Sequence, residues 1–261
     1  MEVICLLFQG RELPFLTLVL LFAVTVYLIR KGGPVPAIRK IAGLEAVDEA
    51  IGRATEMGKP VFFTPGGGDV SSGASAVDTM AAIEVLSHVA RLAARYKLSL
   101  TVGVREPSTH VIADQTVREA YVAAGQAELY NPNQVQFYSP EQFAYAASCV
   151  GFFHREHPAA IFLLGFFQAE ALMLAEGAAQ SGGIVIGGMV RFNQLPTMVA
   201  ACDYTLIAEE LFVSGAYLSK NATKLSCVRA QDFGKVAALV LIGLGALMAT
   251  LGDKTLATLF K

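Results

Sequence analysis

The feature that most constrains the fold of this chain is a short apolar run that leads through a glycine-rich turn into a long helix, at residues 59–75. The letters KPVFFTPGGGDVSSGAS predict a buried strand at 61–64, then the turn, then the helix start. In an open α/β sheet such a turn lies at the carboxyl edge of the strands, where ligands bind and free backbone N–H groups face the crevice. The stretch therefore predicts both a fold class and the position of a candidate site.

The same alternation of apolar runs and amphipathic helices continues along the chain. Runs such as FLL, IVI and VFF suit strands that are buried on both faces of a parallel sheet. About six strands that alternate with helices predict a three-layer, Rossmann-like α/β fold with a mainly parallel sheet. The expected strands are 61–64, 98–104, 135–138, 161–164, 184–186 and 204–208. The first expected helix begins near Gly43. The other expected helices cover about 74–96, 111–125, 140–155, 168–180, 195–202 and 209–220.

One helix start has a well-formed local signature. Ser139 stands where an N-cap is expected, Pro140 follows at the first helical position, and Gln142 takes the place of the capping-box residue. The pattern predicts a helix capped by Ser139.

Two uncharged apolar segments flank the α/β pattern. The chain has 261 residues, of which 54% are hydrophobic and 16% charged, and its mean hydropathy of +0.51 is high for an ordinary soluble domain. A helix that crosses a bilayer needs roughly 17–25 apolar residues. We therefore expect a fold flanked by two transmembrane helices, with the chain divided into a tail (1–12), a first span (13–29), a linker (30–42), the α/β domain (43–233), a second span (235–252) and a second tail (253–261).

Basic residues predict the orientation of these segments, because Lys and Arg near the ends of membrane spans stay in the cytoplasm. The pattern places the protein in the cell membrane with two spans, the central domain in the cytoplasm and both termini outside, so that the lipid bilayer is a partner. A cleaved signal peptide is disfavoured, since the charge follows the first apolar run instead of preceding it. The basic residues that flank the domain side of the two segments are Arg30, Lys31, Arg39, Lys40, Lys220, Lys224, Arg229 and Lys235.

Residues 143–190 are apolar enough to suggest a further span as an alternative. Glu170 and Glu176 oppose it, because a carboxylate at mid-bilayer costs about 2.5–3.5 kcal/mol on insertion scales. If these segments belong to the α/β domain, a subunit interface or the membrane surface should cover their surplus apolar surface. We therefore expect a homo-oligomer or a membrane complex.

Cysteine spacing and charge exclude other classes. The four cysteines (Cys5, Cys149, Cys202 and Cys227) form no C-x-x-C pair, which favours reduced thiols. A net charge of −2 and the lack of a basic stripe predict no nucleic-acid partner.

The glycine turn is the first candidate binding element. Gly66, Gly67 and Gly68 allow close approach of a ligand to the backbone, and Ser71 and Ser72 would add hydroxyl donors at a helix start. The match to a dinucleotide fingerprint is partial, since Ser71 occupies the third glycine position, and no P-loop ending follows. Two interpretations stay open, a flexible turn or a site for an anionic small molecule. No cofactor is assigned.

Carboxylates at the strand ends are the second candidate. Asp69, Glu106, Glu170 and Glu209 follow strands whose ends meet at one edge, so they could hold Mg²⁺ or act in acid/base chemistry. The alternative is that Asp69 caps a helix and the glutamates occupy first helical turns, where the helix dipole favours them. We assign no metal site.

One part of the sequence also resembles a known family. Residues 39–65, RKIAGLEAVDEAIGRATEMGKPVFFTP, with an apolar segment on either side of the domain, resemble a family of uncharacterised bacterial and archaeal membrane proteins. The resemblance implies an α/β domain between two membrane anchors. It implies no activity, so it transfers no functional residues.

The absence of a complete catalytic motif favours a noncatalytic role. The leading hypothesis is an assembly or ligand-sensing component. The alternative is an enzyme that binds a nucleotide or a phosphorylated metabolite at Gly66 to Gly68.

Overall fold

The computed structural model describes residues 19, 20, 23, 24, 27, 40–71, 73–219 and 222–250. The chain divides into two compact units, one of residues 39–219 and one formed by residues 1–38 and 220–261. The α/β unit ends at Ser219, and the next helix begins at Ala222.

A six-stranded parallel sheet forms the centre of the α/β unit. Its spatial order is β3-β2-β1-β4-β5-β6, so the chain starts in the middle, builds one half outward, and returns beside β1 to build the other. This is the Rossmann order, and the predicted α/β fold with a parallel sheet is confirmed. The strands are β1 (Val61–Gly66), β2 (Leu100–Val104), β3 (Val135–Phe137), β4 (Ala160–Phe166), β5 (Ile184–Met189) and β6 (Tyr204–Ile207).

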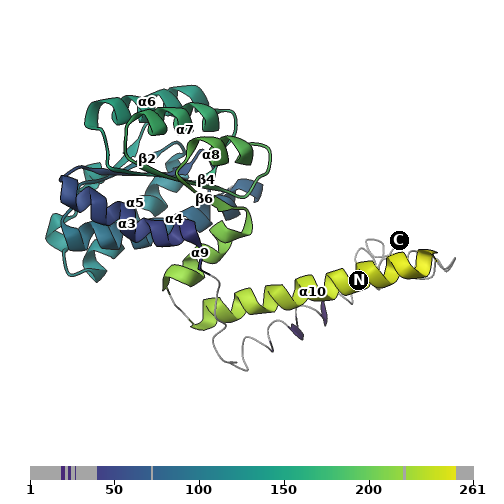
Figure 1. The fold of residues 1–261 in the computed structure, drawn as a ribbon. Coiled ribbons are helices and arrows are strands. Elements are labelled where there is room, and N and C mark those ends of the chain that lie inside the picture. The colour runs from purple at the N-terminus through teal and green to yellow at the C-terminus, as the bar shows by residue number, and fades with distance from the viewer. Residues whose placement is uncertain are drawn as a thin grey trace, which may run out of the picture. The chain divides into compact units, whose positions relative to one another are not determined.

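Helices cover both faces of the sheet, as predicted for three layers (Figure 1). One layer holds α3 (Ala42–Met57), α4 (Gly73–Tyr96), α5 (Pro107–Ala123) and α9 (Glu209–Ser219). The opposite layer holds α6 (Gln142–Glu156), α7 (Glu170–Gln180) and α8 (Leu195–Ala201). Two 3₁₀ turns, η1 (Ala127–Leu129) and η2 (Pro132–Gln134), lead into β3.

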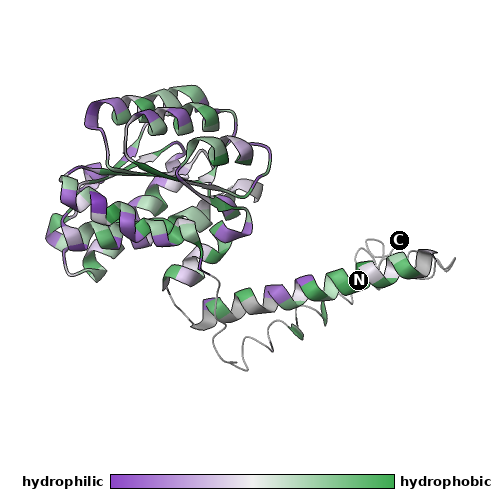
Figure 2. Cartoon of the chain, viewed as in Figure 1, coloured by the Kyte–Doolittle hydropathy of each residue, from purple (hydrophilic) through white to green (hydrophobic). Residues whose placement is uncertain are grey.

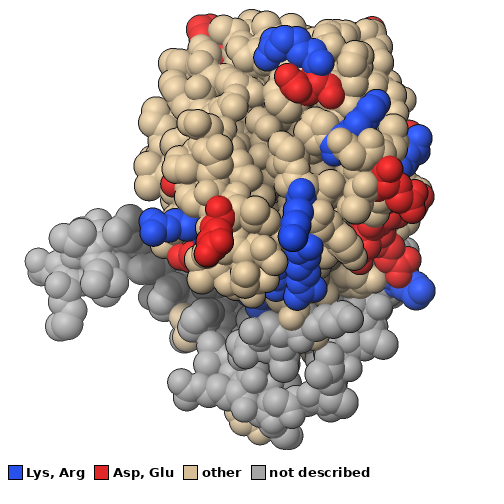
Figure 3. Space-filling model, turned by 90° about the vertical axis from the view of Figure 1, so that its left-hand side faces the viewer, with Lys and Arg blue, Asp and Glu red and all other residues tan. Residues whose placement is uncertain are grey.

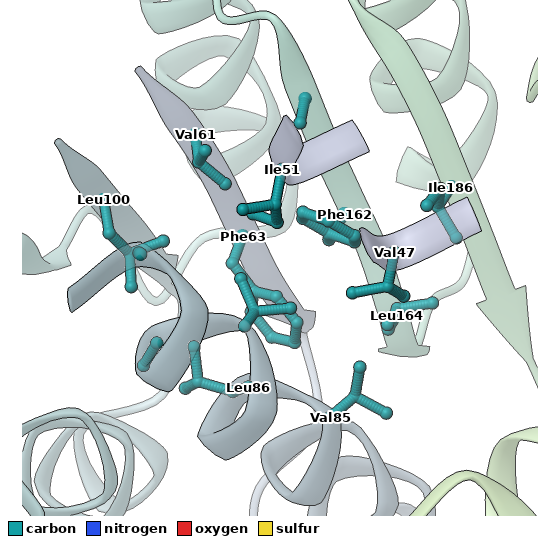
Figure 4. Close-up of a cluster of buried hydrophobic side chains, with 14 of the residues drawn as sticks. Val47, Ile51, Val61, Phe63, Val85, Leu86, Leu100, Phe162, Leu164 and Ile186 are labelled. Atoms are coloured by element: carbon teal, nitrogen blue, oxygen red, sulfur yellow. The ribbon is translucent and has the colours of Figure 1, made fainter. Parts of the chain in front are cut away.

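Successive side chains of β1 point to opposite faces of the sheet, which explains why Val61, Phe62 and Phe63 are all apolar. Phe63 points into the layer of α3 and α4, where it stacks on Phe162 at 6.1 Å and lies near Ile51 and Leu86 (Figure 4). Phe62 points to the opposite layer. Because helices cover both faces, both faces of this strand carry apolar side chains from Val61 to Phe63, and the one buried polar side chain, Thr64, is hydrogen-bonded to Tyr145 and to Gly66 N.

Two predicted helix starts differ in the structure. Ser139 does not cap α6, because its hydroxyl accepts a hydrogen bond from Glu141 N at 3.1 Å and so belongs to the preceding turn. Glu141 is the N-cap, and its carboxylate accepts from Phe143 N at 3.3 Å. Helix α5 begins at Pro107, earlier than predicted, because proline holds Glu106 in the extended conformation that suits an N-cap.

Residues 143–190 fold as most of α6 and the whole of β4, α7 and β5, within the α/β unit. The alternative of a further membrane span is therefore wrong. The interior of the unit buries most of the apolar side chains of these segments. Some remain on the surface, and the starts of α6 and α7 expose Phe143, Leu172 and Met173.

The expectation of two membrane spans needs correction. Residues 13–29 lie mostly outside the described residues. The second expected span falls in α10 (Ala222–Thr250), which is mostly hydrophobic only in its second half (Figure 2). Its uncharged stretch starts at Val236, after an ion pair of Lys235 with Asp232 at 3.8 Å.

Within the described ranges, no helix combines the length and the apolarity needed to cross a membrane. This finding overturns the predicted location, a two-span protein of the cell membrane with a cytoplasmic central domain and both termini outside.

Charged side chains of both signs are mixed on the face that Figure 3 shows, without a stripe of one sign. Such a surface does not favour a polyanionic partner.

Candidate functional site

The candidate site lies where the strand order reverses, between the carboxyl ends of β1 and β4. The two strands stay paired to Gly66 and Phe166, with a register shift after Thr64, and Gly67 N donates to Phe166 O at 2.8 Å. Gly66 has φ +80° and Gly165 has φ +122°. A Cβ at Gly66 would lie only 2.1 Å from Phe166 O, so glycine is required here for the close approach of the two strand ends.

Gly68 packs against the start of two helices. Its carbonyl oxygen accepts from Thr109 Oγ1 of α5 at 2.9 Å, and a Cβ would lie 2.2 Å from Thr79 Oγ1 of α4. At Gly66 and Gly68, therefore, the space that glycine leaves is taken by the protein itself. The use of this turn to hold a phosphate stays a prediction.

Asp69 ties the turn to α5. Its carboxylate accepts from Ser108 Oγ at 2.5 Å, from Ser71 N at 2.8 Å and from Ser71 Oγ at 2.7 Å. These hydrogen bonds, that of Ser108 foremost, lower the pKa of Asp69 below its ordinary value. The second predicted serine, Ser72, lies outside the described residues.

Glu170 has the least usual environment at this edge. It is the first residue of α7 and its side chain is 0% exposed. Oε2 accepts hydrogen bonds from Gln142 Nε2 and, at 3.1 Å, from Gln168 N. Oε1 is buried and has no hydrogen-bond partner. One oxygen of the carboxylate is thus held in place, while the other is buried without a hydrogen bond.

Arg105 lies beside this free oxygen. A Cβ built on Gly67 would be 2.8 Å from Arg105 Nη1 and 3.1 Å from Glu170 Oε1, so both groups converge over Gly67. Arg105 Nε donates to Pro140 O at 2.9 Å and lies 3.6 Å from Glu106 Oε1. The side chain of Arg105 is 19% exposed, so it keeps contact with solvent.

A second arginine follows β5 at the same edge. Arg191 Nε lies 3.5 Å from Asp78 Oδ2, and the guanidinium carbon lies 4.7 Å from the centre of the Phe166 ring, a cation–π arrangement. Burial raises the pKa of Asp78, and Arg191 only partly counteracts this rise.

Three of the four candidate carboxylates lie at separate helix starts, whereas Asp69 lies in the turn before α4. Glu106 is the N-cap residue of α5, and Glu170 and Glu209 are the first residues of α7 and α9. Among the described residues, no group of three His, Cys, Asp or Glu side chains could hold a metal ion. The interpretation that the helix dipole favours the glutamates fits Glu170 and Glu209.

Sequence reasoning missed three polar groups that complete this edge: Ser108, Thr109 and Gln142. Ser108 and Thr109 follow Arg105 closely, so they could have been found at the end of β2. Gln142 had no such signal, since its contact with Glu170 joins the starts of two different helices.

Residues 5–260 match the family described as Domain of unknown function (DUF6754), so the chain belongs to this family. No curated protein and no solved structure matches the chain. The expectation of a family without an assigned activity is confirmed. The match does not support a membrane location or a bacterial or archaeal source.

Proposed function

We propose that the α/β unit is a noncatalytic ligand-sensing module whose ligand donates a hydrogen bond to Glu170. The observation that carries the proposal is the buried Glu170 Oε1 without a partner. An unsatisfied buried acceptor costs about 1–3 kcal/mol, and native proteins keep few of them. The position adds support, because α/β proteins bind ligands at the carboxyl ends of the strands where the strand order reverses.

Two thiols of the α/β unit and the carboxylate of Asp69 favour sensing over catalysis. The thiols of Cys149 and Cys202 have pKa values raised by burial, that of Cys202 to about 12, so neither is a thiolate nucleophile near neutral pH. The oxygens of Asp69 already accept hydrogen bonds from Ser71 and Ser108. The alternative of a nucleotide-binding enzyme gains little support, since Gly66 and Gly68 face protein atoms.

The conservative variant Glu170→Gln tests the ligand site. The amide oxygen can keep the hydrogen bonds from Gln142 and Gln168, while the amide nitrogen replaces the free oxygen and presents a donor. Thermal unfolding of the full chain should be followed with a panel of amino acids, nucleotides, sugar phosphates and inorganic phosphate. We expect at least one compound to raise the Tm of the wild type, because a ligand at 100 times Kd adds about 2.7 kcal/mol. Glu170→Gln should not respond to it.

Glu176→Gln is the matched control, since Glu176 lies on the same helix and is exposed. This variant should respond to the ligand like the wild type. A panel without any shift, or a shift that persists in Glu170→Gln, would contradict the proposal.

We also propose that the module acts as a homo-oligomer through the starts of α6 and α7. The hydrogen bond of Gln142 with Glu170 holds these two helix starts together, and Phe143 and Leu172 next to it are 56% and 57% exposed. Neighbouring exposed apolar side chains are typical of an interaction surface. The proposed partner is a second copy of this chain.

Light scattering after size exclusion tests the assembly. The wild type should be oligomeric, and the double variant Phe143→Ser with Leu172→Ser should have the mass of a monomer and an unchanged circular dichroism spectrum. Val111→Ser with Val122→Ser is the control, because both valines are exposed on α5 in the opposite layer. A monomeric wild type would refute the assembly.

A further inference from the structure

The geometry points to a small zwitterion of the α-amino acid class as the ligand of Glu170, with its ammonium group on Glu170 Oε1 and its carboxylate on the Arg105 guanidinium. This inference rests on the proposed function and goes beyond it by naming the chemistry of the ligand. Its basis is that the Glu170 carboxylate and the Arg105 guanidinium, which have opposite charges, both lie over Gly67 but do not form an ion pair.

The two groups are held apart by their other contacts. Both side chains are described, and the structure shows no ion pair between them. The hydrogen bond and the ion pair of Arg105 both use Nε, on the side of Pro140 and Glu106. Both hydrogen bonds of Glu170 use Oε2. Glu170 Oε1 and Arg105 Nη1 therefore remain on the side of Gly67. A Cβ built on Gly67 would lie 3.1 Å from Glu170 Oε1 and 2.8 Å from Arg105 Nη1.

The charges select among small ligands. An anion such as phosphate would meet the carboxylate of Glu170, and a metal ion would meet the guanidinium of Arg105, so each would be repelled by one member of the pair. An α-amino acid carries an ammonium donor and a carboxylate acceptor on the same carbon atom. It satisfies both groups at once, with charge-assisted hydrogen bonds on each side.

Burial gives the ligand a direction. Glu170 is 0% exposed, whereas Arg105 is 19% exposed. The ammonium group therefore enters first and the carboxylate stays nearer to solvent. The space over Gly67 is crowded, so Arg105 must shift outward as the ligand enters. Two contacts of Arg105 oppose this shift, the hydrogen bond to Pro140 O and the ion pair with Glu106.

Glycine and L-alanine are the probes, and trimethylglycine is the matched control, because it keeps both charges but has no N–H donor. Titration calorimetry and thermal unfolding of the full chain should show saturable binding of glycine or L-alanine, and no binding of trimethylglycine, methylammonium or acetate. Glu170→Gln should abolish binding. Arg105→Gln should weaken binding at least tenfold, with circular dichroism as the check that it remains folded.

The outcomes separate this inference from the proposed function. If another class of compound binds and depends on Glu170, the ligand-sensing proposal stands and the amino acid inference is overturned. If glycine or L-alanine binds equally well to Glu170→Gln, or trimethylglycine binds as well as glycine, the inference is overturned. If nothing binds, both fail and the free Glu170 oxygen is a structural feature only.

Discussion

Replacement of Gly66 by alanine should destabilise the α/β unit by about 3 kcal/mol or more, the largest effect that we expect from a single methyl group. Gly66 has φ +80°, and a left-handed conformation costs an L-residue roughly 1–2 kcal/mol. The new Cβ would lie 2.1 Å from Phe166 O. This neighbour is backbone, so β1 and β4 must move apart, and overpacking of this kind adds about 1–3 kcal/mol.

The variant Gly58→Ala separates the two contributions. Gly58 has φ +62° at the end of α3, but no atom lies within 4 Å of the position of its Cβ. Its replacement should cost only the conformational part, roughly 1–2 kcal/mol. Urea unfolding of both variants measures the difference. Equal losses would show that the strand ends do not meet as closely as described. Gly165→Ala, with its Cβ 2.2 Å from Pro65 O, tests the same contact from the other strand.

The sequence predicted the sheet better than it predicted the use of its glycines. The run from Val61 to Phe63 shows a strand buried on both sides, because no polar residue interrupts it. Gly66 to Gly68 indicate only that the backbone is free to bend. Whether a ligand or another part of the chain uses that freedom depends on β4, which lies about 100 residues away in sequence, and local patterns carry no such information.

The candidate site was predicted in its position but not in its chemistry. Parallel strands bring their carboxyl ends to one edge, so Glu170 could be placed there from sequence. Its burial and its free oxygen depend on neighbours such as Gln142 and Arg105, which belong to other parts of the fold. The predicted second span is not supported, because no helix among the described residues is long and apolar enough to cross a membrane.

Replacement of Phe62 by alanine is expected to cost about 3–5 kcal/mol, as large aromatic residues in cores usually do. Phe62 of β1 is fully buried against α6. The centre of its ring lies 5.0 Å from that of Phe152 and 4.9 Å from that of Phe153, which it meets edge to face. These contacts fix α6 on the sheet, and the start of α6 carries Gln142, which holds Glu170. The loss should therefore reach the candidate site as well as the core.

Urea unfolding and the ligand response together measure this coupling. The control is Phe192→Ala, because Phe192 is 74% exposed between β5 and α8 and its loss should change the free energy of unfolding by less than about 0.5 kcal/mol. At temperatures where Phe62→Ala is still folded, its affinity for the compound that stabilises the wild type should fall, since α6 can shift into the space that the ring leaves. An unchanged affinity would show that α6 does not position Glu170. A loss of stability as small as that of Phe192→Ala would contradict the packing of α6 against β1.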